Sequence, residues 1–246
     1  MIAALYAEFR KFMTVRSTYI VSVLGLVLAG FIAFWGIGYK GSPDLLRQSD
    51  ALQRASMDVV SIVGVFVGIL AILLICHEYR YNTISYTLTT SNSRFRVLLA
   101  KLITTGAYAL IMTFIALAVG MALVALGANM AGHSLGTQTI DLYSLIWKTV
   151  AYMIGSAWLG LILGFLSRSL VFAIVAYFLI PTLEPLLNGL LKISNNYLPN
   201  AAQNQILQTA SSPDVFSPLA SLGVFSIYLA VGFIASAFLF LKRDAN

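Results

Sequence analysis

The sequence has few of the residues that carry out chemistry in enzymes. It contains one cysteine, Cys76, and two histidines, His77 and His133. A single cysteine cannot form an internal disulfide, so it gives no indication of the redox compartment. No HExxH or CxxC pattern occurs, and the adjacent residues Cys76, His77 and Glu78 would point about 100° apart on a helix. We therefore expect neither a metal site nor a catalytic residue.

Charged residues are also scarce. They make up 10% of the 246 residues, whereas 59% are hydrophobic, and the mean hydropathy is +0.88. Soluble domains contain about 25% charged residues, so this composition indicates an integral membrane protein. The net charge of +6 reflects a shortage of acids beside apolar runs, which favours membrane orientation over nucleic-acid binding. A GxxxxGK[ST] phosphate-binding loop is absent, so no nucleotide or other cofactor is expected in this chain.

Six apolar segments are long enough to cross a bilayer, which takes a helix of about 20 residues. The expected spans are residues 18–39, 57–76, 97–127, 143–166, 170–190 and 219–241. The first run exceeds the roughly 7–15 apolar residues of a signal peptide, so we do not expect cleavage. The sequence thus predicts an all-α integral membrane protein with a single transmembrane domain over residues 1–246.

Lysine and arginine residues gather on one side of these spans. Most of them flank the spans on the side that carries both termini, and most acidic residues lie on the other side. The positively charged side of a membrane protein normally faces the cytoplasm. We therefore expect a multi-pass protein of the cell membrane with both termini in the cytoplasm.

Two segments outside the spans have recognisable patterns. Residues 1–16 place apolar side chains at helical spacing, which indicates an amphipathic helix in the cytoplasmic interface. The alternative is a frayed terminus with chance spacing. Residues 191–218, which follow Pro181 and Pro185 and include Pro199 and Pro213, are too broken to span. We expect them to form short re-entrant helices on the extracellular side.

Glu184 is an isolated acid near the outer end of the fifth span, between Pro181 and Pro185. A carboxylate within the membrane is costly and usually faces a helical bundle or a cavity. It is therefore a candidate gate or substrate-facing acid. The alternative is that the helix has already ended and Glu184 lies at the water boundary.

Small residues recur at a spacing that lets helices approach closely. Gly64 and Gly68 lie in the second span, and Gly160 and Gly164 lie in the fourth. Such faces mediate close helix packing, either within one subunit or between two. The motif alone does not distinguish these cases.

Residues 77–93 form a polar segment between two apolar spans. The segment contains Tyr79, Tyr81, Ile84, Tyr86 and Leu88 beside arginines, a combination typical of protein contact surfaces. We expect a short cytoplasmic helix that contacts a partner. Two alternatives are an aromatic belt at the membrane interface and arginines that only set orientation.

Two stretches resemble a known family. The sequence HEYRYNTISYTLTTSNSRFRVLLAKL resembles the segment after the second span in permeases of ABC exporters of the second class, which are the six-span subunits of drug, polysaccharide and lantibiotic-immunity transporters. The matching residues are Glu78, Tyr79, Arg80, Thr83, Ser93, Arg94, Arg96, Leu98, Leu99, Ala100 and Lys101. The stretch AEFRKFMTVRS resembles the amphipathic connecting helix of the family, with Glu8, Lys11 and Arg16 in place.

The resemblance implies a dimer with a second copy or a sister permease, above separate cytoplasmic ATPase subunits that hold ATP and Mg²⁺. Residues 77–93 would contain the coupling helix. The ATPase interface would comprise Glu8, Lys11, Glu78, Tyr79, Arg80, Thr83, Ile84, Tyr86, Leu88 and Arg94.

The resemblance also implies a central path. Its lining would include Val59, Val63, Phe66, Ile69 and Leu70, with Glu184 as a path or gate residue. An apolar path suits export of a hydrophobic or amphipathic cargo, such as a lipid-like molecule, a drug or an antimicrobial peptide. The alternatives are a membrane scaffold or immunity protein that binds peptides without transport, and an intramembrane enzyme.

Overall fold

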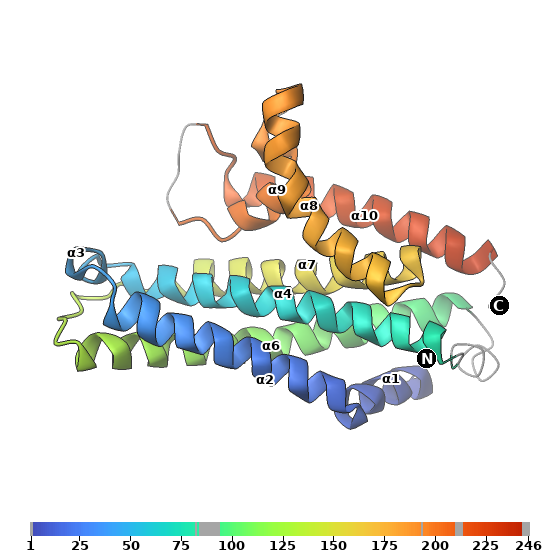
Figure 1. The fold of residues 1–246 in the computed structure, drawn as a ribbon, viewed down its shortest axis with the longest axis horizontal. Coiled ribbons are helices and arrows are strands. Elements are labelled where there is room, and N and C mark those ends of the chain that lie inside the picture. Colours follow the sequence, from blue (N-terminus) through green and yellow to red (C-terminus); the bar gives the residue numbers. More distant parts are fainter. Residues whose placement is uncertain (1, 82, 84–93, 193, 210–213, 243–246) are drawn as a thin grey trace.

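The computed structural model describes residues 2–81, 83, 94–192, 194–209 and 214–242, and every regular element in these ranges is helical (Figure 1). The elements are α1 (Ile2–Thr14), α2 (Arg16–Phe31), a π-helical continuation η1 (Ile32–Tyr39), α3 (Pro43–Leu46), α4 (Ala51–Arg80), α6 (Arg94–Met130), α7 (Leu142–Ser167), α8 (Leu170–Leu191), the 3-10 turn η2 (Asn195–Tyr197), α9 (Pro199–Gln205) and α10 (Pro218–Lys242).

Six of the described helices are long and apolar enough to cross a membrane. They cover Arg16–Tyr39, Ala51–Arg80, Phe95–Met130, Leu142–Ser167, Leu170–Leu190 and Pro218–Phe240. The prediction of an all-α fold with six candidate spans is therefore confirmed. The second of these helices, α4, extends beyond the expected apolar run 57–76 at both ends. Polar residues can continue a helix beyond the part that a bilayer covers.

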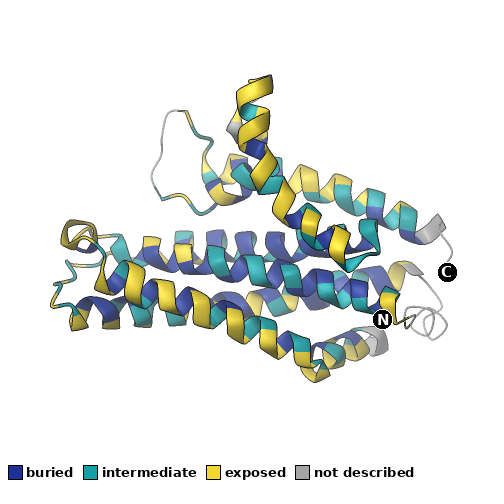
Figure 2. Cartoon of the chain, viewed as in Figure 1, coloured by how far each residue is buried: buried dark blue, intermediate teal, exposed yellow. Residues whose placement is uncertain are grey.

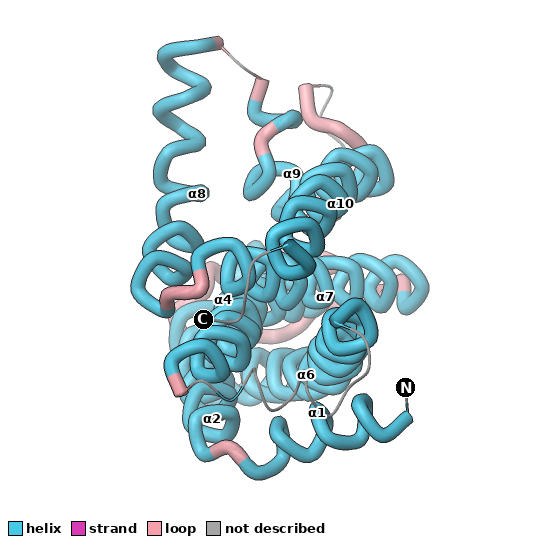
Figure 3. Tube along the Cα trace, turned by 90° about the vertical axis from the view of Figure 1, so that its right-hand side faces the viewer, coloured by secondary structure: helices cyan, strands magenta, loops and turns pink. Residues whose placement is uncertain are grey.

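The helices form a bundle with one outlying group. Helices α2, α4, α6 and α7 run side by side, whereas α8 leans away from them and α10 lies across α7 (Figure 1). Viewed along the bundle, α8, α9 and α10 lie on one side of it and α1 on the other (Figure 3). Helix α1 and the end of α10 lie at the same end of the bundle, opposite α3 (Figure 1). We call these the terminal end and the α3 end.

Helices α4 and α7 are the most buried and form the centre of the bundle (Figure 2). A Cβ atom on Gly160 would collide with the carbonyl oxygen of Gly68, and one on Gly64 would meet the Tyr152 ring. Gly164 packs against Ile75 in the same way. Gly64, Gly160 and Gly164 thus lie at contacts between α4 and α7 of one chain, and the two backbones touch at Gly68 and Gly160, while a Cβ atom on Gly68 would meet Tyr177 of α8.

The structure corrects one expectation for the fifth span. Helix α8 contains both Pro181 and Pro185 and continues to Leu191, so the helix has not ended at Glu184. The interpretation of Glu184 as a residue beyond the helix end is wrong. The segment after α8 does contain short helices, η2 and α9, while their depth in a membrane stays a prediction.

Candidate functional site: a buried ion-pair cluster where three helices meet

Four charged side chains from three helices meet at the terminal end of the bundle. Lys101 Nζ of α6 lies 2.8 Å from Glu8 Oε2 of α1 and 2.6 Å from Glu78 Oε1 of α4. Lys11 Nζ of α1 lies 2.8 Å from Glu8 Oε1 and 2.7 Å from the same Glu78 Oε1. Each ammonium group therefore binds both carboxylates. We call these four residues the ion-pair cluster.

The local sequence explains how the four charges converge. Glu8 and Lys11 are three residues apart, so they share one face of α1. Helix α1 is fixed on the bundle by Phe12, which is 3% exposed and stacks on Tyr108 of α6 with ring centroids 5.0 Å apart. Glu78 lies in the last turn of α4 and Lys101 in the second turn of α6. The two charges thus flank the connection between α4 and α6.

These ion pairs are largely shielded from water. The pKa values of Glu8 and Lys11 are set by burial and by the charges beside them. The Lys101 side chain is only 3% exposed, whereas that of Lys11 is 35% exposed. Burial alone would raise the pKa of Glu8, but Lys101 and then Lys11 outweigh it, so the pKa of Glu8 is lowered. Burial alone would lower the pKa of Lys11, yet Glu78 and Glu8 raise it. Glu8 and Lys11 are therefore charged near neutral pH.

The end of α7 adjoins this cluster through an aromatic contact. The guanidinium of Arg168 lies over the Tyr79 ring, with Cζ 5.1 Å from its centroid. Arg168 adopts a left-handed conformation with φ of 52° just after the last residue of α7, and this places its side chain beside α4. The second carboxylate oxygen of Glu78, Oε2, is buried and accepts no hydrogen bond from residues 2–81, 83 or 94–242 as far as these are described.

The structure places the predicted interface residues in two groups. Glu8, Lys11 and Glu78 belong to the ion-pair cluster and face inward, whereas Arg80 and Thr83 are exposed. Residues 77–80 are the last turn of α4 and not part of a loop. Of the other predicted interface residues, Tyr79 is half-buried and Arg94 begins α6. Ile84, Tyr86 and Leu88 lie outside the described residues.

Lys101 completes the cluster, and its role there was not predicted. It was recognised only as part of a sequence pattern and as a charge that sets orientation. A lysine in the second turn of an apolar helix needs a buried partner. That requirement was the available signal, but it does not identify Glu8, which is 93 positions away.

The predicted path residues occupy two environments. Val59 and Val63 have 0% exposure and Leu70 has 2%, so these three lie inside the chain in this conformation. Phe66 and Ile69 are half-buried, and the Phe66 ring packs on Gly25 of α2. A role for these residues along a cargo path stays a prediction.

Glu184 has a defined partner in the structure. Its carboxylate accepts hydrogen bonds from the backbone N–H groups of Asn200 and Ala201, the latter at 2.9 Å. These N–H groups belong to the first turn of α9, where a helix leaves its donors unsatisfied. Glu184 is 5% exposed. It therefore acts as an N-terminal cap that attaches α9 to α8.

Neutral side chains also attach α9 to the other helices. Gln203 Nε2 donates to Ser156 Oγ of α7 at 2.6 Å. Gln205 Nε2 donates to Asn196 Oδ1 at 2.9 Å, and Ser221 Oγ of α10 donates to Gln205 Oε1 at 2.9 Å. The amides of this short helix thus connect α7, η2 and α10.

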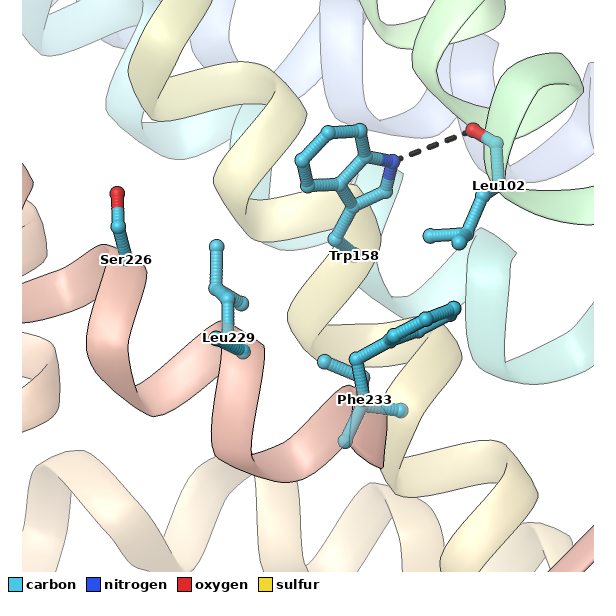
Figure 4. A pocket seen from close by; sticks show the side chains of 7 residues that line it. Leu102, Trp158, Ser226, Leu229 and Phe233 are labelled. Atoms are coloured by element: carbon cyan, nitrogen blue, oxygen red, sulfur yellow. Dashed lines mark hydrogen bonds between the residues drawn. The ribbon is translucent and has the colours of Figure 1, made fainter. Parts of the chain in front are cut away.

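An apolar pocket lies between α6, α7 and α10. It has a volume of about 260 Å³, and its lining includes Leu102, Trp158, Leu229 and Phe233 (Figure 4). Trp158 Nε1 donates to the carbonyl oxygen of Leu102 at 3.2 Å (Figure 4). The indole N–H is thereby satisfied, and the pocket presents hydrocarbon surface.

Comparison with known proteins identifies the family. A model of the ABC-2 family of transporter proteins matches residues 4–184, which include the whole ion-pair cluster and Glu184. No curated protein matches the sequence. The match covers well over half of the chain and agrees with six candidate spans. The chain belongs to the ABC-2 family of transporter proteins and is a multi-pass permease subunit of an ABC transporter.

Proposed function

We propose that this permease exports a hydrophobic or amphipathic molecule, driven by ATP hydrolysis in separate cytoplasmic ATPase subunits that bind the terminal end. The ion-pair cluster is the observation that carries this proposal. It joins α1 to both helices that flank residues 81–93. A partner that binds this region would therefore act on three helices together.

The cluster suits the transmission of force because its charges are paired and buried. Separating Lys101 from either carboxylate would leave a buried charge unpaired, which costs several kcal/mol. Helices α1, α4 and α6 therefore resist separation at this end. A displacement applied beside Arg80 would tilt α4 and α6 as one unit.

The energy source must lie outside this sequence. The sequence has no phosphate-binding loop, and membership of the ABC-2 family implies an ABC ATPase partner. ATP and Mg²⁺ would bind that partner. We further propose a dimer with a second copy or a sister permease in the cell membrane. Basic residues such as Arg10, Arg16 and Arg80 at the terminal end support a cytoplasmic location for that end.

Reconstitution with a partner ATPase tests the proposal. The chain and a candidate ABC ATPase from the same genome are co-purified, placed in lipid nanodiscs and assayed for ATP hydrolysis. Arg80→Ala should weaken ATPase binding, because Arg80 is exposed beside the connection. Glu78→Gln should instead preserve binding and reduce the transport-linked stimulation of ATP hydrolysis.

Arg47→Ala provides the matched control, because Arg47 is exposed at the α3 end. It should change neither binding nor hydrolysis. Failure of any ABC ATPase to co-purify would contradict the proposal and would leave a peptide-binding scaffold as the better description. Equal behaviour of Glu78→Gln and wild type would contradict the role of the cluster.

A further inference from the structure

A cavity at the α3 end contains a carboxylate that has no partner among the described residues. The cavity has a volume of about 530 Å³ and lies between α4 and the region of α9. Helix α4 contributes Arg54, Met57, Asp58 and Ser61, which share one face because they are spaced at positions i, i+3, i+4 and i+7. This volume lies within the range of about 300–1,000 Å³ that is usual for small-molecule sites.

Asp58 is the unpaired charge in this cavity. It is exposed on the surface of the single chain, and its carboxylate takes part in no hydrogen bond or ion pair with the described residues. Asp58 lies two turns inside α4 and at the outer end of the expected apolar span 57–76. Carboxylates in membrane helices are costly, face cavities or bundle interiors, and mark substrate or ion pathways.

The neighbouring charges do not satisfy Asp58. Arg54 is already engaged, because its Nε lies 2.6 Å from Asp50 Oδ2 and its Nη1 donates to Gln48 Oε1 at 3.2 Å. In an adjoining cavity of about 450 Å³, Lys148 Nζ donates to the carbonyl oxygen of Gln208 at 2.7 Å. The two cations that line these cavities therefore have other partners, and the carboxylate of Asp58 is left unpaired among the described residues.

The chemistry of the cavity favours an organic ammonium group over a metal ion or an anion. Among the described residues, no group of three or more His, Cys, Asp or Glu could hold a metal, and Ca²⁺ takes six to eight oxygen ligands. An anion would be repelled by Asp58. An ammonium group would pair with the carboxylate and could also donate to the hydroxyl of Ser61 or the side-chain oxygen of Asn204, which line the same cavity.

An apolar stripe continues from the cavity along α4. Val65 and Ile69 follow Ser61 at intervals of four residues, so they lie on the same face, and both are half-buried. A ligand with a positive head group at Asp58 could place a hydrocarbon tail along this stripe.

We propose that the cavity between α4 and α9 binds the ammonium group of a cationic amphiphile through Asp58. The inference rests on the proposed function in one respect, because it takes this amphiphile to be the class of cargo. The binding itself needs neither an ATPase nor transport.

Equilibrium dialysis with three matched probes tests the proposal. Radiolabelled n-octylammonium, n-octyl glucoside and n-octyl sulfate are offered to the full chain in phosphatidylcholine nanodiscs, and uptake by empty nanodiscs is subtracted. Saturable binding of n-octylammonium is expected, with weaker binding of the neutral probe and least of the sulfate. Asp58→Asn should weaken n-octylammonium binding about tenfold and leave n-octyl glucoside unchanged.

Two further variants fix the interpretation. Asp44→Asn removes an exposed carboxylate at the same end but outside the cavity and should leave binding unchanged. Arg54→Gln removes a cation from the cavity and releases Asp50, so it should strengthen n-octylammonium binding. Equal binding by wild type and Asp58→Asn, or preference for the sulfate, would overturn the proposal.

Light scattering separates the ligand from a second copy of the chain. If Asp58→Asn dissociated a dimer, the partner of Asp58 would be a cation of another copy, and the proposal would be wrong. Probe binding without an effect on ATP hydrolysis in the reconstituted complex would support this site and argue against the proposed function. Stimulated hydrolysis without probe binding would do the reverse.

Discussion

The two ends of the bundle are held together by different chemistry. At the terminal end, two lysines and two glutamates form a buried cluster that joins α1, α4 and α6. At the α3 end, amide side chains, a hydroxyl and one carboxylate attach α9 to α7, α8 and α10. The first end has compact, buried ion pairs, whereas the second has mostly hydrogen bonds beside two cavities and a more exposed ion pair between Arg54 and Asp50.

This difference teaches how stiffness is distributed along the molecule. Removing one partner of a buried ion pair costs about 3–5 kcal/mol, whereas a neutral hydrogen bond contributes about 1 kcal/mol. The terminal end should therefore move as one body. The α3 end should rearrange one contact at a time, which suits a region where a ligand enters or leaves.

Loss of Lys101 should produce the largest effect. Lys101→Met would leave Glu8 and Glu78 with only the half-exposed Lys11 between them, at a cost of about 3–5 kcal/mol. The midpoint of thermal unfolding in detergent micelles should fall by roughly 10 °C.

Lys11→Met is the matched control, because it removes the same group from the same two carboxylates at a site that is 35% exposed. It should lower the midpoint less. A larger effect for Lys11→Met than for Lys101→Met would show that burial is not what makes the cluster strong.

Acid should weaken the terminal end selectively. The pKa of Glu8 is lowered from 4.5, so its stabilisation is present above pH 4.5 and is lost as the pH falls through the folded-state value. The pKa of Lys11 is raised from 10.5, so its stabilisation is lost only as the pH rises beyond 10.5. The midpoint of thermal unfolding should be constant between pH 4.5 and pH 10.5 and should decrease as the pH falls below 4.5.

The acid effect that Glu8 contributes should be smaller than the effect of Lys101→Met, because it alters one carboxylate, whereas Lys101→Met removes a partner from two carboxylates. Glu8→Gln should lower the midpoint at neutral pH and flatten the fall in acid. An unchanged acid slope in Glu8→Gln would assign the acid sensitivity to another group.

Removal of the Glu184 charge should loosen the α3 end alone. Glu184→Gln weakens the cap on α9, and caps contribute about 0.5–2 kcal/mol. Amide hydrogen exchange should quicken over Pro199–Gln205 and remain unchanged in α1.

Asp214→Asn serves as the control, since Asp214 is exposed and offers only its backbone carbonyl to Asn196. Faster exchange in α1 for Glu184→Gln would show that the two ends are coupled and would remove the contrast between them.

The smallest effect should come from one amide. Gln203→Met keeps the shape of the side chain and removes the hydrogen bond to Ser156, which still donates to the carbonyl oxygen of Tyr152 at 3.1 Å. The free energy of unfolding should fall by about 1 kcal/mol. Gln208→Met, at an exposed position, should have no measurable effect. A loss for Gln203→Met as large as that for Lys101→Met would contradict the difference between the two ends.

The sequence predicts the spans well because their signal is local. An unbroken apolar run reports directly on the length of helix that a bilayer covers. The π-helical segment η1 gave no such signal, because Ile32–Tyr39 is as apolar as an α-helical span. The expected fifth span, residues 170–190, agrees with α8, but the prolines left the place where the helix ends open, because prolines normally end helices.

The site was predictable only in part. Glu8, Lys11 and Glu78 were identified from a family pattern and assigned to an outward-facing contact, but they face one another. Pairing across 93 positions depends on tertiary packing that no short motif encodes. The partner of Glu184 was even harder to predict from the sequence, because it is a pair of backbone N–H groups that any residue other than proline could provide.

The glycine contact between α4 and α7 has a consequence for motion. Because Gly68 and Gly160 bring backbone against backbone, no layer of side chains lies between these helices at that point to act as a sliding surface. Shear between packed helices proceeds by small side-chain adjustments, and here that mechanism is blocked. The contact between α4 and α7 therefore acts as a fixed point about which α4 can tilt. A displacement of Glu78 in one direction should move Asp58, on the other side of this contact, in the opposite direction.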